Sequence, residues 1–327
     1  MMRSLPRIAG GIDPLVRLLV LAIVLASVAP VTGAYRPIAE GISQGAIFVL
    51  FLLNGLRLPR AEVLRGMRHL RFLVPLAGWS FAAMSLAGWG LAQAGTALLL
   101  PPTVALGLLF LGALPSTVQS ATAYSSLAGG NVAVSVVAAA FLNILGVFLS
   151  APLFSLLAGS EAAAFDLGAL RRIALILLLP FVLGQLAQGM AGHLVRDHRR
   201  LATWMDRLAI AIAVYVAFSA AVEQGLWRLV GLSDWAALLL LVGLFLAFGF
   251  GGAWLLSGAL RLAPADRIAF LFAGAQKSIA LGAPLASVLF PPAVAGLLLL
   301  PVLTYHLLQL VLSAPLASRL AGPRDRP

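Results

Sequence analysis

Two short segments decide the fold of this chain: residues 110–116 read FLGALPS and residues 272–278 read FAGAQKS. A second pair supports the first, because LSAPL occurs at 149–153 and again at 312–316. The first pair is separated by 162 positions and the second by 163, about half of the 327-residue chain. Self-similarity at a nearly constant offset indicates an internal repeat, with one copy in each half.

The composition shows which solvent surrounds these repeats. The chain is 61% hydrophobic and 10% charged, and its mean hydropathy is +1.03. Soluble domains hold about 45–50% apolar and about 25% charged residues. One apolar stretch after another is long enough to cross a bilayer at about 20 residues each. Backbone groups in lipid must be satisfied internally, so these stretches are expected to be helices.

The apolar stretches predict an all-α integral membrane protein with ten transmembrane helices. The first stretch is taken as a helix rather than a cleaved signal peptide, because Pro30 would block cleavage and Asp13 interrupts the basic segment before it. The ten expected spans are 15–34, 38–56, 71–93, 98–127, 131–157, 170–190, 205–222, 235–260, 265–289 and 292–318.

The arginines predict the orientation. The net charge is +11, but the basic residues gather in short loops between apolar stretches, which argues against nucleic acid as a partner. Cytoplasmic basic residues outnumber those on the other side in membrane proteins. With the N-terminus inside, only Arg36, Arg171, Arg172 and Arg228 lie outside. We therefore expect a multi-pass protein of the plasma (inner) membrane with both termini in the cytoplasm.

Ten spans and two repeats place five spans in each half, residues 1–160 and residues 161–327. Since five is odd, the second half enters the membrane from the opposite side, and the repeats are inverted. Inverted repeats are typical of secondary transporters, whose sites lie near the bilayer midplane where broken helices meet.

The fourth span is expected to break at Pro115. Proline removes a backbone donor but is favoured at the start of a helix. A half-helix that starts at Pro115 would direct free N–H groups toward an anion. The alternative is an ordinary proline kink whose serines bond back onto the helix. The candidate binding residues that follow the break are Ser116, Thr117, Gln119 and Ser120.

The ninth span carries Gln276, Lys277 and Ser278 at the matching position. Lys277 is the only lysine in the chain, and ionisable groups inside a membrane are usually functional. Its ammonium is a candidate counter-charge for an anionic substrate, a proton-coupling group, or both, because lysine can lose its proton on burial. The alternative is that Lys277 snorkels to an interface. No carboxylate is expected inside a span to pair with it, so its removal is expected to ease folding.

Asn143 and His306 form a further matched pair, each six residues before its LSAPL segment. Both are polar and fall in the middle of a span, and both are candidates to line the same cavity. A hydrogen bond between helices is the competing interpretation for each. The chain has no cysteine, and its four histidines show no metal-ligand spacing, so no metal, cofactor or catalytic residue is expected.

At these residues the chain resembles the bile acid:sodium symporter superfamily, and most closely its bile-acid-symporter-like (cotransporter 7-like) branch. The matching segments are FLLNGL (51–56), residues 115–131, LGVFLSAPL (145–153) and QKSIALGAPLASVLF (276–290). The resemblance implies a core domain of spans three to five and eight to ten, with spans four and nine crossing. It implies a panel domain of spans one, two, six and seven, which moves against the core during transport of an organic anion.

The chain departs from the pattern of the sodium-coupled members. They carry a Glu-x-Gly-x-Gln-Asn motif in span nine, and this chain has Phe272 for the acid and Lys277 for the asparagine. A Ser-Asn pair of span four reads Ser120-Ala121 here. The resemblance therefore implies coupling to protons or sodium in which strict sodium dependence is not expected, and the Lys277 ammonium stands where a sodium ion would.

The leading hypothesis is a secondary active transporter of a small organic anion, and not an enzyme. A membrane regulator of ion homeostasis that transports nothing is the first alternative. An intramembrane hydrolase with Lys277 as base and Ser116 as nucleophile is the second. The expected partners are the lipid bilayer and the small anion, and the sequence leaves the oligomeric state open.

Overall fold

The computed structural model describes residues 13–57, 69–159, 171–172 and 174–321, and these residues contain helices but no strand. The helices are α1 (Pro14–Val28), α2 (Arg36–Arg57), α4 (Leu70–Ala77), α5 (Met84–Ala97), α6 (Pro102–Ala113), α7 (Val118–Leu127), α8 (Val132–Ala158), α10 (Leu179–Asp197), α11 (Arg199–Glu223), α12 (Leu226–Leu229), α13 (Leu232–Ala259), α14 (Pro264–Ala275), α15 (Ile279–Leu289) and α16 (Pro292–Leu320). A π-helical turn joins α4 to α5, and another precedes α10.

The number of membrane-spanning helices agrees with a multi-pass membrane protein. Within the described ranges, eight helices are long and apolar enough to cross a membrane, and the bent pair α6–α7 makes a ninth. α1 is apolar but only 15 residues long. It was expected to reach residue 34 but ends at Val28, because the residue before Pro30 is disfavoured in the helical conformation. α11 begins at Arg199, six residues before the expected start of span seven.

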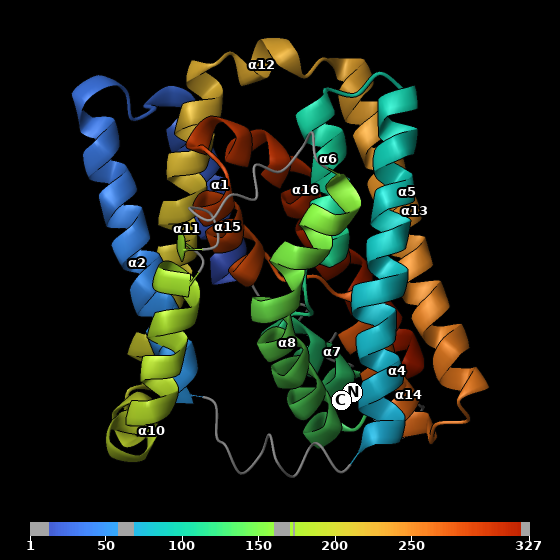
Figure 1. Ribbon diagram of the computed structural model, residues 1–327. Coiled ribbons are helices and arrows are strands. Elements are labelled where there is room, and N and C mark those ends of the chain that lie inside the picture. Colours follow the sequence, from blue (N-terminus) through green and yellow to red (C-terminus); the bar gives the residue numbers. More distant parts are fainter. Residues whose placement is uncertain (1–12, 58–68, 160–170, 173, 322–327) are drawn as a thin grey trace, which may run out of the picture.

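One group of helices consists of α1, α2, α10 and α11. α2 packs against both α10 and α11, and α1 packs against α11. Gly55 of α2 faces Gly184 of α10, and a Cβ atom on either glycine would overlap the backbone of the other helix. The absence of side chains at this crossing lets the two helices approach closely, as small residues do in membrane interfaces. This group forms one side of the bundle (Figure 1).

The remaining long helices form a second group around α6, α14 and α16. α6 lies against α5, α8 and α16, while α14 lies against α7, α8 and α13. A Cβ atom on Gly88 of α5 would come 2.7 Å from the carbonyl oxygen of Leu108 in α6, so this crossing also depends on glycine. The segment Pro264–Leu289 is the most enclosed span, with 94% of its most apolar window buried, against 17% for the span 174–195.

The two groups meet where α11 packs against α15 and α16. At this contact Gly296 of α16 sits on α11, and a Cβ atom there would come 2.5 Å from the carbonyl oxygen of Ala217. The face of α11 at this contact is built from small residues. α15 and α16 accordingly form the part of the second group nearest α11 in Figure 1.

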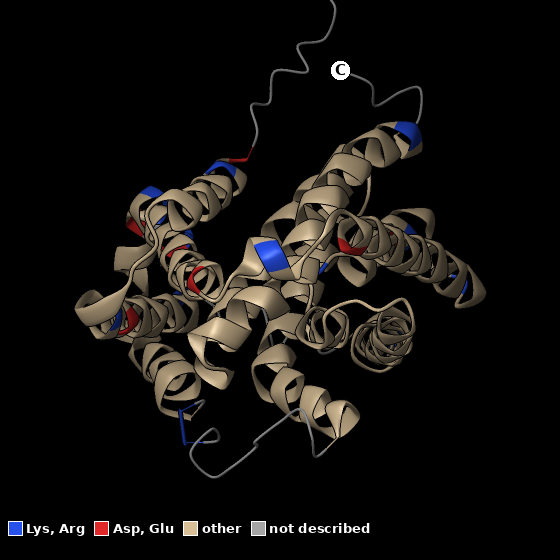
Figure 2. Cartoon of the chain, turned by 90° about the horizontal axis from the view of Figure 1, so that it is seen from above, with Lys and Arg blue, Asp and Glu red and all other residues tan. Residues whose placement is uncertain are grey.

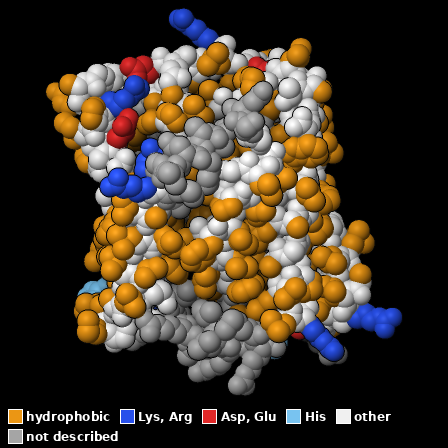
Figure 3. Space-filling view, viewed as in Figure 1, with side chains coloured by type: hydrophobic (Ala, Val, Ile, Leu, Met, Phe, Trp, Pro, Cys, Tyr) orange, Lys and Arg blue, Asp and Glu red, His pale blue; other side chains and the backbone are white. Residues whose placement is uncertain are grey.

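The surface is that of a protein surrounded by lipid. Large apolar side chains are widely exposed on the helices, including Leu186 at 69%, Leu255 at 72% and Val311 at 67%. The described part of the face drawn in Figure 3 is mainly hydrophobic side chains together with backbone and uncharged polar or glycine positions, with Lys and Arg toward its upper and lower ends. Viewed from above, charged residues are few and scattered among uncharged helices (Figure 2).

A candidate binding site at two helix breaks

The fourth span is broken where the sequence predicts. α6 ends at Ala113, α7 begins at Val118, and the two helices are bent by 62°. The expectation that the second half-helix starts at Pro115 is wrong by three residues. Leu114 precedes the proline and is held extended at ψ 149°, and Thr117 is extended at ψ 139° as the residue that caps α7.

The ninth span is broken at the matching position. α14 ends at Ala275 and α15 begins at Ile279, with Gln276 and Ser278 in extended conformations between them. The Ser278 hydroxyl accepts a hydrogen bond from the Leu281 N–H at 3.3 Å and so caps the first turn of α15. A serine at this point ends the break and starts the second half-helix.

The two breaks touch each other, as expected. The Ser278 N–H donates to the carbonyl oxygen of Pro115 at 2.8 Å. Gly146 of α8 leaves room for the proline ring, because a Cβ atom there would come 2.5 Å from Pro115 Cγ. Backbone groups that each broken helix leaves unpaired are thus partly satisfied by the other, which a lipid-embedded protein requires.

The Lys277 ammonium is completely buried and is held by three backbone carbonyls. Nζ donates to Leu114 at 2.7 Å, Gly112 at 2.8 Å and Ser80 at 3.0 Å. These three acceptors match the three N–H groups of an ammonium. The interpretation that Lys277 snorkels to an interface is wrong. The assumption that the cation has no partner is also wrong, because carbonyl dipoles take the place of a carboxylate.

The position of the ammonium follows from the broken helix. The carbonyls of Gly112 and Leu114 lie at the C-terminal end of α6, which has no continuing turn to bond them. That end carries a partial negative charge, and a cation there is favourable. Because all three N–H groups point at the backbone, the ammonium does not face an open path in this structure.

Gln276 joins the two broken helices through its side chain. Its Oε1 accepts from the Thr117 hydroxyl at 2.7 Å and also from Ser120. Its Nε2 donates to Ser313 of α16 at 3.2 Å. Gln276 is fully buried and Thr117 nearly so, whereas Ser120 is partly exposed.

Gln309 of α16 belongs to the site but was not among the predicted residues. Its Oε1 accepts from the Lys277 N–H at 2.8 Å, and its Nε2 donates to the Lys277 carbonyl at 3.0 Å. The same Nε2 lies 2.9 Å from Nδ1 of His306. The sequence signal for Gln309 is a polar residue three positions after His306 in an apolar span. His306 thus contacts the break through Gln309 and through the Lys277 backbone.

Of the other predicted residues, Asn143 and Ser116 lie at the break and Gln119 does not. The Asn143 amide donates to the carbonyls of Ser116 and Ala139, both at 2.8 Å, which is the helix-bonding alternative. The Ser116 hydroxyl is buried without a hydrogen-bond partner among the described residues. Gln119 is exposed on α7, and no hydrogen bond joins it to the described part of the break. The structure therefore brings together the predicted residues except Gln119.

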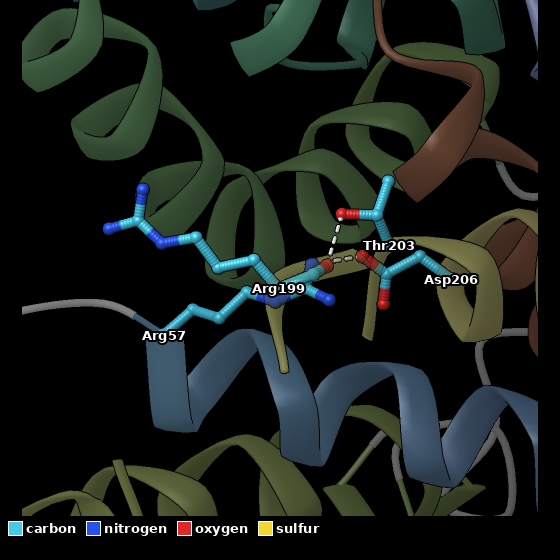
Figure 4. Close-up of polar contacts among 4 residues, drawn as sticks. All are labelled: Arg57, Arg199, Thr203 and Asp206. Carbon is cyan, nitrogen blue, oxygen red and sulfur yellow. Dashed lines mark hydrogen bonds and ion pairs between the residues drawn. The ribbon is translucent and has the colours of Figure 1, made fainter. Parts of the chain in front are cut away.

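Charged residues of the first helix group also lie within the bundle. Asp206, eight residues into α11, forms an ion pair with Arg57 at the end of α2 (Figure 4). Arg207 lies 3.8 Å from Asp13 at the start of α1. The expectation that no carboxylate lies inside a span is wrong for Asp206, which is the second residue of the expected span seven and the eighth residue of α11. Arg57 pairs with this acid, and Lys277 does not.

Comparison with known proteins identifies the family. Residues 13–322 match the model of the SBF-like CPA transporter family. The chain is 37% identical to "Uncharacterized protein PA2026" of Pseudomonas aeruginosa and 36% identical to "Putative symporter YfeH" of Escherichia coli, in each case over 94% of this chain and 92% of the relative. It is 24% identical to "Sodium/bile acid cotransporter 7" of the mouse, over 84% of this chain and 82% of the relative. The resemblance seen in the sequence is confirmed, and the family is one of transporters rather than enzymes: this chain is a multi-pass membrane protein that belongs to the SBF-like CPA transporter family.

Proposed function

We propose that this chain is a secondary active transporter of a small organic anion that works by alternating access around the crossed breaks of spans four and nine. The observation that carries the proposal is the hydrogen bond between the Ser278 N–H and the Pro115 carbonyl, which ties the two breaks together at 2.8 Å. The names of two relatives, "Putative symporter YfeH" and "Sodium/bile acid cotransporter 7", favour coupled transport of an organic anion.

The architecture that we propose has ten spans in two inverted halves, residues 1–160 and 161–327. α1 would be the first span, added to the eight long helices and the bent pair. The matched positions support the repeat, since Gly146 contacts Pro115 in one half and Gln309 contacts Lys277 in the other. An inverted repeat gives a transporter two similar arrangements, one open to each side.

The panel domain in this proposal is α1, α2, α10 and α11, and the core is the rest. Their contact runs through α11 against α15 and α16, and it includes the close approach of Gly296 to Ala217. Among the described residues, no ion pair joins the two bodies, so none has to break when one body moves on the other. The basic-residue bias supports an orientation with both termini in the cytoplasm of a cell bounded by the plasma (inner) membrane.

The substrate anion in this proposal binds near the half-helix N-termini at Val118 and Ile279, where free N–H groups and the positive dipole ends converge. Polar groups that support it are the Ser116 hydroxyl, which has no partner among the described residues, and the partly exposed Ser120. Lys277 contributes charge through the field of its ammonium rather than by direct contact, because its three N–H groups already have acceptors.

Strict sodium coupling is not part of the proposal. Three carbonyls at the break of a helix would suit a bound cation, and the Lys277 ammonium fills that place. A covalently attached cation cannot be exchanged across the membrane. Coupling would then fall to protons, or to sodium at another position.

Flux into liposomes tests the proposal. A panel of small organic anions is first screened for thermal stabilisation of the purified protein, and the anions that bind are then followed into proteoliposomes. Uptake above that of empty liposomes is expected, and it should be lost on disrupting the break with Gly146→Ala. The lipid-facing Leu255→Ala variant, 72% exposed, serves as the matched control and should transport normally. Binding without flux would favour the non-transporting regulator.

A further inference from the structure

The orientation of the Gln309 side chain is determined by its backbone partners. The N–H of Lys277 can only donate, so the Gln309 atom 2.8 Å away is the oxygen Oε1. The carbonyl of Lys277 can only accept, so the atom 3.0 Å away is Nε2. The N–H2 group of Gln309 therefore also faces Nδ1 of His306, at 2.9 Å.

This orientation determines the tautomer of His306. An N–H2 group can only donate, so Nδ1 must be the unprotonated acceptor nitrogen. A neutral imidazole carries its single proton on the other nitrogen, which is Nε2. His306 is therefore a neutral Nε2–H imidazole as long as Gln309 holds Lys277.

A proton on Nδ1 would conflict with this arrangement. Both imidazole nitrogens would then be donors, and Nδ1–H would face the N–H2 of Gln309. Rotating the Gln309 amide by half a turn would present Oε1 to the protonated His306. The same rotation would place N–H2 against the Lys277 N–H and Oε1 against the Lys277 carbonyl. Both contacts with Lys277 would be lost, so Gln309 can serve the protonated histidine or the helix break, but not both.

We propose that Nδ1 of His306 is a proton-binding site whose occupation releases the Lys277 backbone from Gln309 and loosens the break between α14 and α15. This assignment rests on the proposed function. It names the coupling ion of the transporter as a proton and His306 as the residue that binds it. The coupling between proton binding and the break is reciprocal. A state of the protein in which the break is rearranged must therefore bind the Nδ1 proton more tightly than the present state does.

Few titratable groups surround His306 besides the Lys277 ammonium, whose three N–H groups bond to backbone carbonyls. α6 and α15 contain no titratable residue, and α13 carries only Asp234, in its first turn. The Tyr124 hydroxyl of α7 donates to the Leu310 carbonyl at 3.0 Å. On α16 itself, the Tyr305 hydroxyl donates to the Ala275 carbonyl at 2.5 Å, and Arg319 lies in the last turn.

The first helix group contributes charged residues on α11, which packs against α16. α11 carries Asp206, which is paired with Arg57, and Arg207, which lies beside Asp13; its further titratable residues are Arg199, Arg200, Tyr215 and Glu223.

The tautomer can be tested without any substrate. The other three histidines, His69, His193 and His198, are exposed, so a His69→Gln/His193→Gln/His198→Gln variant keeps His306 and its surroundings intact. In this protein, labelled with ¹⁵N-histidine, the nitrogen shifts at neutral pH should show one Nε2–H tautomer. The Nδ1–H tautomer, or a mixture of the two, would overturn the proposal.

Hydrogen exchange tests the coupling to the break. Amide protection over residues 276–281, corrected for the intrinsic effect of pH, should fall about tenfold or more between about pH 7.5 and about pH 5 in the wild type. His306→Gln should abolish this change, and α8 should show none in either protein. Equal pH dependence in both proteins would overturn the proposal. Neither measurement involves transport. A negative result would overturn the role of His306 alone, because uptake into proteoliposomes tests the proposed function separately.

Discussion

The ammonium nitrogen of Lys277 lies 2.7 Å from the carbonyl oxygen of Leu114, so the lysine of one broken helix neutralises the open end of the other. The same nitrogen reaches Gly112, the last residue but one of α6, and Ser80 of the π-helical turn before α5. One side chain thus joins three segments that are far apart in the sequence. Its loss is expected to affect folding as well as transport.

Lys277→Met should lower the free energy of unfolding by about 2–5 kcal/mol, because three buried carbonyls lose a charged donor and gain none. This reverses the expectation from the sequence, in which an unpaired cation made its removal favourable. The measurement is thermal unfolding in detergent, with Leu255→Met on the lipid face as the control. A variant as stable as the wild type would show that these carbonyls find other partners.

Lys277→Arg should also fail to support transport, although it keeps the charge. The site is closed by carbonyls at 2.7 to 3.0 Å around a single point, which suits a compact ammonium. A planar guanidinium is larger and presents its donors as a fork. Uptake in proteoliposomes, normalised to the amount of inserted protein, measures the loss. Normal uptake by the arginine variant would mean that the break tolerates a different packing.

Gly146→Ala should disrupt the break in span four. The added methyl group would come 2.5 Å from Pro115 Cγ, so the proline and its hydrogen bond to Ser278 must shift. Overpacking of this kind costs about 1–3 kcal/mol. Gly243→Ala is the matched control, because its Cβ would meet nothing within 4 Å and alanine favours a helix. The two melting temperatures should therefore move in opposite directions.

Anion uptake should be nearly the same in sodium and in choline buffer at equal ionic strength. The physical reason is that the Lys277 ammonium already fills the three-carbonyl site at the break. Initial rates at several sodium concentrations measure the dependence. A steep requirement for sodium would show that hydroxyl and amide oxygens elsewhere, such as those of Thr117, Ser120 and Gln276, form a site of their own.

The ion pair between Arg57 and Asp206 should contribute measurably to the stability of the first helix group. Both side chains are mostly enclosed, at 28% and 14% exposure, and breaking such a pair leaves an uncompensated charge. A double-mutant cycle with Arg57→Ala and Asp206→Ala should give a coupling energy of about 1–3 kcal/mol. The more exposed pair of Arg36 and Glu223 is the control and should give less.

Much of this protein could be predicted from local features of the sequence. Long apolar stretches are sufficient to predict a membrane protein, because lipid admits only structures whose backbone bonds are internal. Pro115 and Lys277 marked both breaks, since a proline removes a backbone donor from the helix and a lone lysine is costly in lipid. The proline signal does not state where the next helix begins, and the start of α7 was misplaced by three residues.

Only the tertiary structure decided what the polar residues contact. The sequence placed Lys277 within a span, but the direction of its ammonium depends on carbonyls of Ser80, Gly112 and Leu114, more than 160 positions away along the chain. Gln309 likewise gains its role from the packing of α16 against the break. The apolar spans and their breaks could be predicted because they depend on residues that are close together in the sequence. Which donor meets which acceptor depends on how the helices pack in three dimensions, and no local sequence pattern contains that information.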